Sequence, residues 1–234
     1  MKVIYEDNHI IVIHKESGEI VQGDKTGDVP LSDIVKDYIK MKYEKPGNVF
    51  LGVVHRLDRP VSGLVVFART SKALTRLNKM FQTHEVQKTY WAITSLATPR
   101  NFGAEPLNDG YTQLTHWIVR NEKQNKSYAY DHEVPNSKKA VLDYRIIARG
   151  DRYQLCEVRL HTGRHHQIRC QLSKVGLCIK GDLKYGSPRS NPDGSISLVS
   201  RKVAFVHPVS KENLTFTSLL PKDNLWNSLS HNAI

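Results

Sequence analysis

Apolar residues in this 234-residue chain occur mainly in short runs that are bounded by turn-forming residues. Runs of this length, alternating or continuous and rich in Val, Ile, Tyr and Phe, are typical of β-strands. The pattern therefore predicts strands at residues 4–5, 10–13, 48–54, 64–68, 88–94, 140–148, 153–160, 202–206 and 214–217.

Three other segments have the repeat of about 3.6 residues that is typical of amphipathic helices. The first spans residues 31–39, with Ser32 as a plausible cap. The second follows a capping Thr70, and the third opens at Gly163 and ends at Gly176. Because strands outnumber helices and connect mostly by hairpins, we expect an α+β fold built on a mixed, mainly antiparallel sheet flanked by helices and loops.

Residues 98–136 differ from the rest of the chain because they are polar, rich in turn-forming residues and only weakly periodic. We expect them to form a peripheral insertion in a single domain that spans residues 1–234. Basic residues lie near Tyr128 and Tyr130, a combination that suits contact with phosphates and unstacked bases. A solvated hairpin is an equally good interpretation of the same pattern.

The chain is strongly basic, with 34 Lys and Arg against 23 Asp and Glu, a formal charge of +11 and an isoelectric point near 9.5. This surplus is expected of a protein whose partner is rich in phosphate, although an inert basic surface has the same charge. No long apolar run or signal peptide occurs, so we expect a cytoplasmic protein that does not contact membranes. Cys156, Cys170 and Cys178 have no C-x-x-C spacing and indicate reduced packing residues.

The segment His55-Arg56-Leu57-Asp58-Arg59-Pro60-Val61-Ser62-Gly63-Leu64 places one carboxylate between two arginines, just before an apolar strand. The two guanidinium groups should lower the pKa of Asp58 and keep its side chain ionised at neutral pH. An ionised carboxylate in a cleft can act as a nucleophile or as a base. Loops anchored by a rigid scaffold are common places for such groups.

This decapeptide resembles the active-site signature of the RluA-type pseudouridine synthases, and further motifs of that family follow in order. The run Val86-Gln87-Lys88-Thr89-Tyr90-Trp91-Ala92 is similar to the second motif, and His161-Thr162-Gly163-Arg164-His165-His166-Gln167-Ile168-Arg169 is similar to the third. The segment Gly181-Asp182-Leu183-Lys184-Tyr185-Gly186 and the opening at 4–15 extend the resemblance over most of the chain. It is a resemblance to a stand-alone catalytic domain, without the S4 RNA-binding domain of many members.

The resemblance implies an enzyme that isomerises uridine to pseudouridine in structured RNA, either ribosomal or transfer RNA. It also implies that Asp58 attacks the sugar or abstracts its proton, that Arg169 is the ionic partner of this carboxylate, and that Tyr90 lies against the target base. This chemistry requires no metal and no organic cofactor. We expect a monomer whose partner is RNA, and neither DNA nor a membrane.

Five further residues are candidates for binding the substrate. Arg56 matches the family position that enters the RNA helix, since a stacked base must be extruded before it can react. Ile168 matches an aliphatic position beside the uracil, and it is almost equally plausible as helix core. His55 could support the loop or contact RNA. Arg164 belongs to the turn before the third helix, and Gln167 is expected to hydrogen-bond the active-site loop.

A zinc site at His161 and His165 is an alternative interpretation of the third motif, because these residues are four apart. Helical geometry would have to continue across the Thr-Gly pair between them, and no cysteine is nearby, so we disfavour it. The chain departs from the family pattern at Pro60-Val61 and at Lys15-Glu16-Ser17-Gly18. These departures concern loop stiffness and RNA choice rather than a catalytic group.

Two rival functions stay open at this point. A catalytically silent protein of the same fold, such as an RNA-binding ribosome assembly factor, would keep the basic surface but has no need of an ionised acid beside RNA. A hydrolase that extrudes a base would release free uracil, whereas an isomerase leaves the mass of the RNA unchanged.

Overall fold

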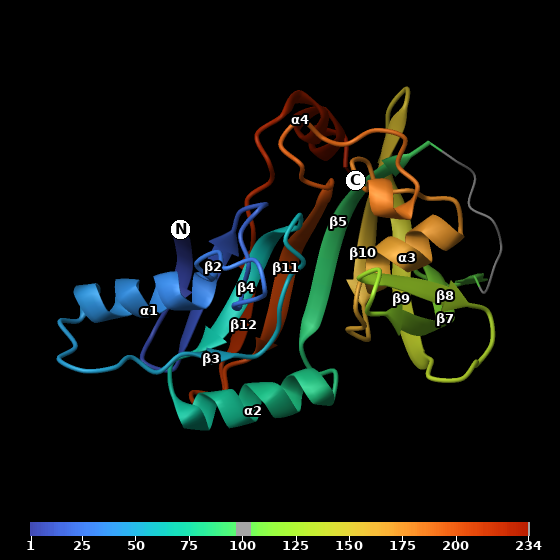
Figure 1. Cartoon of the computed structure of the whole chain (residues 1–234). Coiled ribbons are helices and arrows are strands. Elements are labelled where there is room, and N and C mark those ends of the chain that lie inside the picture. Colours follow the sequence, from blue (N-terminus) through green and yellow to red (C-terminus); the bar gives the residue numbers. More distant parts are fainter. Residues whose placement is uncertain (97–103, 234) are drawn as a thin grey trace. The chain divides into compact units, whose positions relative to one another are not determined.

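The computed structural model describes residues 1–96 and 104–233 of the chain (Figure 1). The chain divides into two compact units, each made of two stretches of sequence. Unit 1 comprises residues 1–87 and 200–219, and unit 2 comprises residues 88–199 and 220–234. None of the described helices is long and apolar enough to span a membrane.

Unit 1 is a sheet with two helices. Its elements are β1 (Lys2–Glu6), β2 (Ile10–Lys15), α1 (Leu31–Lys42), β3 (Gly52–Val53), β4 (Ser62–Ala68), α2 (Ser71–Gln82), β11 (Leu198–Val206, within this unit from residue 200) and β12 (Asn213–Thr217). β1 and β2 form an antiparallel hairpin, and β2 also pairs with β4 in antiparallel register, from Ile10 opposite Ala68 to Lys15 opposite Gly63. The short β3 also pairs with β4, and β11 forms an antiparallel hairpin with β12.

The core of unit 1 forms where α2 packs on these strands. Every residue of β2 and β4 is buried, and the apolar side chains on one face of these strands cluster with Ala73, Leu77 and Met80 of α2. Thr70 caps this helix as the sequence predicts, since its Oγ1 accepts the N–H of Ala73 at 3.2 Å. Two central strands buried along their whole length give the loops at their ends a rigid support.

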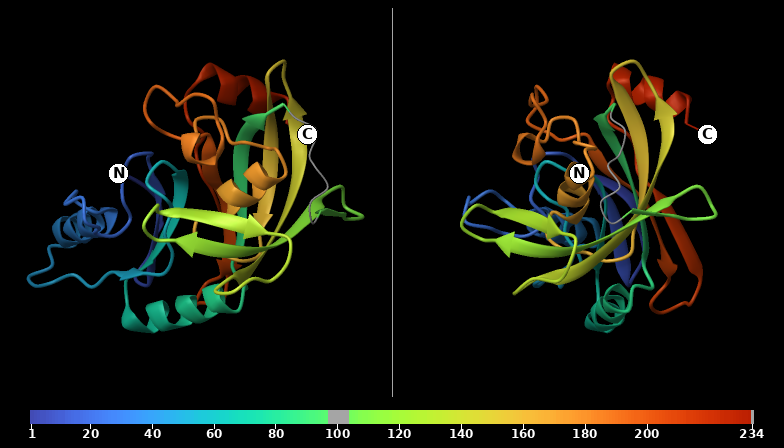
Figure 2. Two further views of the ribbon diagram at one scale, coloured as in Figure 1. Left: turned by 45° about the vertical axis from the view of Figure 1, so that its right-hand side comes forward. Right: turned by 90° about the vertical axis from the view of Figure 1, so that its right-hand side faces the viewer.

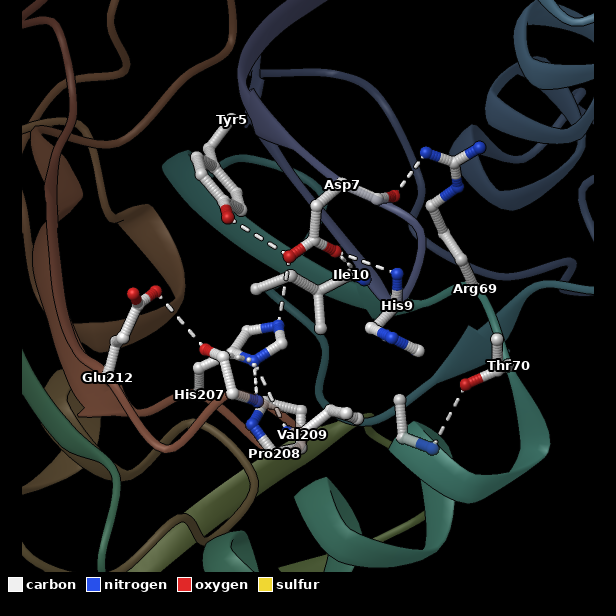
Figure 3. Close-up of polar contacts among 12 residues, drawn as sticks. Tyr5, Asp7, His9, Ile10, Arg69, Thr70, His207, Pro208, Val209 and Glu212 are labelled. Carbon is white, nitrogen blue, oxygen red and sulfur yellow. Dashed lines mark hydrogen bonds and ion pairs between the residues drawn. The ribbon is translucent and has the colours of Figure 1, made fainter.

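A polar network in unit 1 connects the β1–β2 turn to the turn between β11 and β12 (Figure 3). Asp7 accepts the N–H groups of His9 and Ile10 at 2.7 and 2.8 Å and the hydroxyl of Tyr5 at 3.0 Å. Its Oδ2 also lies 2.9 Å from Nε2 of His207. Because Nδ1 of His207 accepts the N–H of Ser210 at 2.8 Å, we assign the ring proton to Nε2, where it faces Asp7.

Unit 2 is an antiparallel sheet with a helix on each face (Figures 1 and 2). Its elements are β5 (Gln87–Ser95), β6 (Ala104–Pro106), β7 (Thr112–Asn121), β8 (Lys126–Tyr130), β9 (Lys138–Arg149), β10 (Tyr153–Leu160), α3 (Gln167–Lys174), the 3₁₀ turn η1 (Leu183–Tyr185) and α4 (Asn224–His231). The strand order is β5-β10-β9-β7-β6, and β8 pairs with β7 as a hairpin.

The two faces of the unit 2 sheet carry different helices. On one face Cys170 of α3 packs with Ile118 and Ala140 of the sheet. On the other face Trp226 and Leu229 of α4 pack with a cluster that includes paired residues of β5 and β10. Because successive strand residues point to opposite faces, the side chains of β5 alternate between the α3 face and the α4 face of the sheet.

Most of the predicted elements are confirmed, and the α+β class is confirmed with them, while the differences are local. Ser32 lies inside α1, because the residue at the N-cap is Pro30. The strand predicted at 48–54 is limited to the two residues of β3. The described part of the 98–136 region forms β6, β7 and β8 at one edge of the unit 2 sheet, whereas residues 97–103 lie outside the described residues.

Candidate active site

Asp58 lies in unit 1, half-buried, on the loop that joins β3 to β4. The N–H of Val61 donates to the carbonyl oxygen of Asp58 at 3.0 Å and closes a tight turn behind the side chain. The N–H of Gly18 donates to the carbonyl oxygen of Arg59 at 2.8 Å. The loop is therefore attached to the segment that follows β2, and this attachment fixes the position of the Asp58 backbone.

Lys15, the last residue of β2, is the buried cation beneath this loop. Its side chain is 0% exposed, and its Nζ donates to the carbonyl oxygens of Val61 at 2.6 Å, Glu16 at 3.0 Å and Arg59 at 3.1 Å. Burial lowers the pKa of Lys15 to about 8, although nearby carboxylates, among them Asp58, act to raise it. One ammonium group thus links the end of β2 to two carbonyl oxygens of the turn that begins at Asp58.

The two segments that depart from the family pattern, 15–18 and 60–61, contact each other. The hydroxyl of Ser17 donates to the carbonyl oxygen of Pro60 at 3.2 Å. The N–H of Glu16 donates to the carboxylate of Glu19 at 2.8 Å, a bond that a proline at this position could not make, because proline has no N–H. The segment after β2 is therefore held by one hydrogen bond within itself and by another to the Asp58 loop.

Arg59 turns away from Asp58. Its guanidinium donates to the carboxylate of Asp28 at 2.6 Å and to the hydroxyl of Thr26 at 2.8 Å, and it lies 3.6 Å from Asp24. The interpretation of Arg59 as a direct ionic neighbour of the Asp58 carboxylate is therefore wrong. Adjacent residues of a tight turn point in different directions, and the side chain of Arg59 anchors the turn at 24–28.

The two residues before the central Leu57 of the motif differ in exposure and in contacts. Arg56 is exposed and forms no hydrogen bond or ion pair within the part of the chain that the structure describes. Nε2 of His55 accepts the N–H of Val66 at 2.9 Å, and its ring stacks on Phe81 with centroids 4.8 Å apart. Of the two roles considered for His55, these contacts favour support of the loop.

Arg169 lies in unit 2 on α3 and is only 6% exposed. Its Nε and Nη2 donate to the two carboxylate oxygens of Asp182 at 2.7 and 2.8 Å, and Asp182 is 1% exposed. A bidentate pair of this kind fixes the plane of the guanidinium as well as its position. A buried arginine without such a partner would be costly, so the pair also explains why α3 tolerates Arg169 at a buried position.

Tyr90 is buried on β5 in unit 2, directly opposite Val158 of β10. The register continues from Val158 to Tyr144 of β9, which shares a face with Ala140, the residue packed against α3. Tyr90 and the helix that carries Arg169 therefore lie on the same face of the unit 2 sheet.

The turn predicted at Thr162 to Arg164 lies further along the chain, because the N–H of Gln167 donates to the carbonyl oxygen of Arg164 at 3.1 Å and closes a turn over residues 164–167. Oε1 of Gln167 accepts the hydroxyl of Thr162 at 2.8 Å and the N–H of Arg164 at 3.0 Å, while its Nε2 donates to Val141 at 3.1 Å. The prediction that Gln167 bonds the active-site loop is therefore wrong. The reason is local, because α3 has no side-chain cap at His166 and the turn needs its own acceptor.

The remaining candidates of the third motif have ordinary structural settings. Arg164 is exposed, and its Nε donates to the carbonyl oxygen of Lys139 at 3.0 Å. Ile168 is buried on α3. The left-handed residue at the start of this helix is His166, with φ of 51°, and not Gly163. Histidine adopts this conformation more readily than most side chains do.

The histidines considered for zinc have other partners. Nε2 of His161 lies 2.5 Å from Oδ2 of Asp143. His165 contacts the hydroxyl of Ser127 at 2.8 Å through Nδ1 and Asn125 at 3.1 Å through Nε2. Among the described residues, no three His, Cys, Asp or Glu side chains are grouped as metal ligands.

Lys15 and Asp182 are the site residues that the sequence analysis missed. Both are charged residues inside quoted motifs, Lys15 at the end of the opening run and Asp182 in the fourth segment. A lysine that ends an apolar strand and an aspartate between two motif glycines were the available signals. Neither signal identifies the contacts of the residue, because Arg59 and Val61 are far from Lys15 in sequence, and Arg169 is 13 residues from Asp182.

The chain is similar to known pseudouridine synthases over most of its length. The family model described as RNA pseudouridylate synthase matches residues 9–174, which contain Asp58, Tyr90 and Arg169. The chain is 32% identical over 245 residues to the ribosomal large subunit pseudouridine synthase D of Pseudomonas aeruginosa, with 97% of this chain and 70% of that protein covered. It is 31% identical over 242 residues to an uncharacterized RNA pseudouridine synthase of Chlorobaculum parvum, with 94% and 71% covered.

Other similar proteins extend the picture. The tRNA pseudouridine synthase C of Pectobacterium carotovorum is 29% identical over 236 residues, which cover 92% of this chain and 58% of that protein. Among solved structures, human RNA pseudouridylate synthase domain containing 4 has a TM-score of 0.75 at 22% identity, with 99% of this chain and 91% of that chain covered. The likeness to that structure supports the fold.

Proposed function

Because this chain belongs to the RNA pseudouridylate synthase family, we propose that it isomerises a uridine of ribosomal or transfer RNA with Asp58 as the catalytic carboxylate. In this reaction the bond from C1′ to N1 breaks, the uracil turns, and C1′ joins C5. The hydrogen on C5 leaves as a proton and N1 gains one. Atoms and charge therefore balance, and the mass of the RNA does not change.

The class of RNA is inferred from the relatives. One similar protein is named for the ribosomal large subunit and another for tRNA, so both substrates are consistent with the family to which the chain belongs. Comparing pseudouridine maps of ribosomal and transfer RNA from cells with and without the gene would decide between them. We expect at least one uridine to lose its modification when the gene is absent.

The observation that carries the proposal is the fixed loop of Asp58. A buried ammonium, that of Lys15, holds three carbonyl oxygens around this loop. Catalytic carboxylates need a supporting shell of this kind, because small displacements of a reacting group reduce the rate strongly. In the proposed reaction Asp58 attacks C1′ or abstracts a sugar proton.

The other roles follow from the chemistry of each side chain. We propose that Arg169, oriented by Asp182 through Nε and Nη2, uses its Nη1 edge to pair with Asp58. Tyr90 would lie against the uracil, and Arg56, which is exposed, would enter the RNA helix and help to displace the target base. A base lifted out of its stack needs such compensating contacts, because unstacking costs a few kcal/mol.

The test is the variant Asp58→Asn, which keeps the shape of the side chain but removes its charge. We expect release of tritium from RNA labelled at C5 of uridine to fall by at least about a thousandfold, with RNA affinity changed less than about threefold. Asp37→Asn on α1 is the matched control, since Asp37 is exposed and the variant has the same change in net charge. Turnover by Asp58→Asn at the rate of the control would refute the role of Asp58.

The same assay separates the rival functions. A catalytically silent binding protein would release no tritium even as wild type, while binding RNA in the usual way. A hydrolase would release free uracil and leave an abasic site in the RNA. The proposed isomerase gives tritium release with RNA of unchanged mass.

A further inference from the structure

The fourth motif segment, Gly181 to Gly186, has no role in the function proposed above except through Asp182. It contains the short turn η1, which follows directly after Asp182. Lys184 and Tyr185 both contact the β7–β8 hairpin, and the ring of Tyr185 also packs with Ile118, Ala140 and Cys170 between the sheet and α3. The segment therefore touches both the buried Arg169 and a hairpin at the edge of unit 2.

Tyr185 is the centre of this arrangement and is only 5% exposed. Its hydroxyl accepts the N–H of Ser127 in β8 at 2.7 Å and lies 2.9 Å from Nδ1 of His166. Its ring faces the guanidinium of Arg169, with Cζ 5.0 Å from the ring centroid. One side chain thus contacts the hairpin, the start of α3 and the arginine.

The hydrogen-bond roles within this cluster can be assigned. Burial, reinforced by the neighbouring Arg169, holds the pKa of His166 far below its ordinary value, so the ring is neutral. The hydroxyl of Tyr185 has one proton and already accepts the N–H of Ser127, so it donates to Nδ1 of His166. Both capacities of the hydroxyl are used, and a buried network that is fully satisfied resists displacement.

Further contacts hold the tip of the hairpin. Nζ of Lys184 donates to the carbonyl oxygen of Asn125 at 3.0 Å. The ring of His165, which stacks on His166 with centroids 3.8 Å apart, bridges the side chains of Ser127 and Asn125. The turn of the hairpin is therefore hydrogen-bonded both to Lys184 of η1 and to His165 of the third motif.

We propose that Tyr185 is a positioning residue that couples the placement of the β7–β8 hairpin to the orientation of the Arg169 guanidinium. The inference rests on the proposed function, in which Arg169 acts on the catalytic carboxylate. A shift of Ser127 moves the Tyr185 hydroxyl, and the ring of Tyr185 limits where the guanidinium of Arg169 can lie. When RNA contacts the basic and aromatic side chains of the hairpin, such as Lys126 and Tyr128, the orientation of the Arg169 guanidinium therefore changes.

The variant Tyr185→Phe tests this coupling, because it keeps the ring beside Arg169 and removes only the hydroxyl. We expect kcat for pseudouridine formation to fall about tenfold while KM stays within about twofold, since an effect on orientation is felt mainly in the transition state. The matched control is Tyr111→Phe, another buried tyrosine of unit 2 whose hydroxyl bonds Glu157 and whose ring contacts arginines. The control should leave kcat within about twofold. Equal kcat values for the two variants would overturn the proposal.

A double-mutant cycle shows whether Tyr185 acts through the arginine. Asp182→Asn weakens the bidentate hold on Arg169, so the pair of variants Tyr185→Phe and Asp182→Asn should not multiply in their effects on kcat. We expect kcat of the double variant to be no more than about twofold below kcat of the slower single variant. Fully multiplicative losses would mean that the two residues act independently, and would overturn the coupling.

Hydrogen exchange keeps this inference separate from the proposed function. The amide of Ser127 should lose protection at least about tenfold in Tyr185→Phe and keep it in Tyr111→Phe. This readout does not require activity. A wild-type chain that forms no pseudouridine would refute the proposed function alone, whereas unchanged protection of Ser127 would refute the coupling alone.

Discussion

A single buried ammonium organises the loop on which the proposed chemistry depends. Because Lys15 donates to carbonyl oxygens of Glu16, Arg59 and Val61, its removal leaves three acceptors in a setting that water cannot fully reach. The variant Lys15→Met keeps the unbranched stem and deletes the charge. We expect it to lower the free energy of unfolding by at least about 2 kcal/mol and to reduce kcat at least about tenfold. Urea unfolding and the tritium assay measure the two effects.

The pH dependence of Lys15 provides a second signature of the same contact. Burial lowers the pKa of Lys15 to about 8 in the folded protein, so the ammonium loses a proton, and with it one donor, as pH rises through that value. The wild-type rate should therefore fall on the alkaline side near pH 8, and the slow Lys15→Met variant should lack this limb. Lys40→Met, an exposed change on α1, is the control. A variant that keeps the wild-type limb would show that another group titrates there.

The residues that could be predicted from the sequence are those whose role follows from chemical type and motif. Asp58 and Arg169 are found on a supported loop and in a buried ion pair, and the placement of Tyr90 on the α3 face is compatible with its expected role. The partners of these residues could not be predicted, because Lys15 and Asp182 meet them only through tertiary folding. Arg59 and Gln167 were misjudged for the opposite reason, since each satisfies a local turn that sequence spacing does not reveal.

At the scale of elements, Gly63 shows how closely the strands of unit 1 approach. Gly63, the second residue of β4, has φ of +119°, a conformation that favours glycine, and it pairs with Lys15 of β2. A Cβ on Gly63 would lie 2.4 Å from the carbonyl oxygen of Ser200, a backbone atom that cannot swing aside. We expect Gly63→Ala to lower the free energy of unfolding by about 3 kcal/mol or more.

Gly47→Ala is the matched control for this prediction. Gly47 has no atom within 4 Å of an added Cβ and no positive φ, so its substitution should change the free energy of unfolding by less than about 0.5 kcal/mol. Thermal unfolding of both variants makes the comparison. If the two variants melted at the same temperature, the close approach of β4 to Ser200 would be incorrect.

The Asp7 network predicts a pH dependence for the contact between two turns of unit 1 (Figure 3). Burial by itself would raise the pKa of Asp7, but the N–H groups of Ile10 and His9, the hydroxyl of Tyr5 and the nearby His207 lower it below the ordinary 3.8. A carboxyl group whose pKa is lower in the folded state stabilises the fold above its unfolded pKa. This contribution is lost as pH falls through the lower, folded value.

The variant Asp7→Asn should therefore be less stable than wild type by about 1–3 kcal/mol at pH 7, and the difference should shrink below about pH 4. Urea unfolding between pH 7 and pH 3 measures it. Asp37→Asn, on the exposed face of α1, should show no such pH dependence. A difference between Asp7→Asn and wild type that stays constant down to pH 3 would contradict the role of the charge.

Elements with strong periodicity were predictable, and those defined by tertiary pairing were not. The buried strands β2 and β4 and the capped helix α2 carry local signals strong enough to be found from sequence. The β7–β8 hairpin has polar outward-facing residues, so the sequence of β7 gives no clear strand signal. Only its pairing with β9 in the structure identifies it as a long strand. Helix α4 is short, and its two buried residues, Trp226 and Leu229, give too little periodicity to predict it.

At the scale of the whole molecule, the basic surplus is present in both units. Unit 1 has 16 Lys and Arg against 12 Asp and Glu, and unit 2 has 18 against 11. Many of the acidic groups are already used in internal pairs, such as Asp182 with Arg169 and Asp28 with Arg59. The charge that remains for a partner is therefore mainly positive, as RNA binding requires.

Association with RNA should weaken steeply with salt, because each neutralised phosphate releases about 0.7 to 0.9 of a counterion. We expect the logarithm of affinity to fall linearly with the logarithm of salt concentration, with a slope steeper than about −3 between 50 and 300 mM. The double variant Lys138→Gln with Lys139→Gln removes two exposed charges at the start of β9, and it should reduce the slope by about 1 to 2 units. Lys36→Gln is the control, since its ammonium pairs with Asp33 at 3.0 Å. An affinity that stayed flat across this range, or a control that changed the slope as much as the double variant, would mean that the positive charge of the chain is not the source of RNA binding.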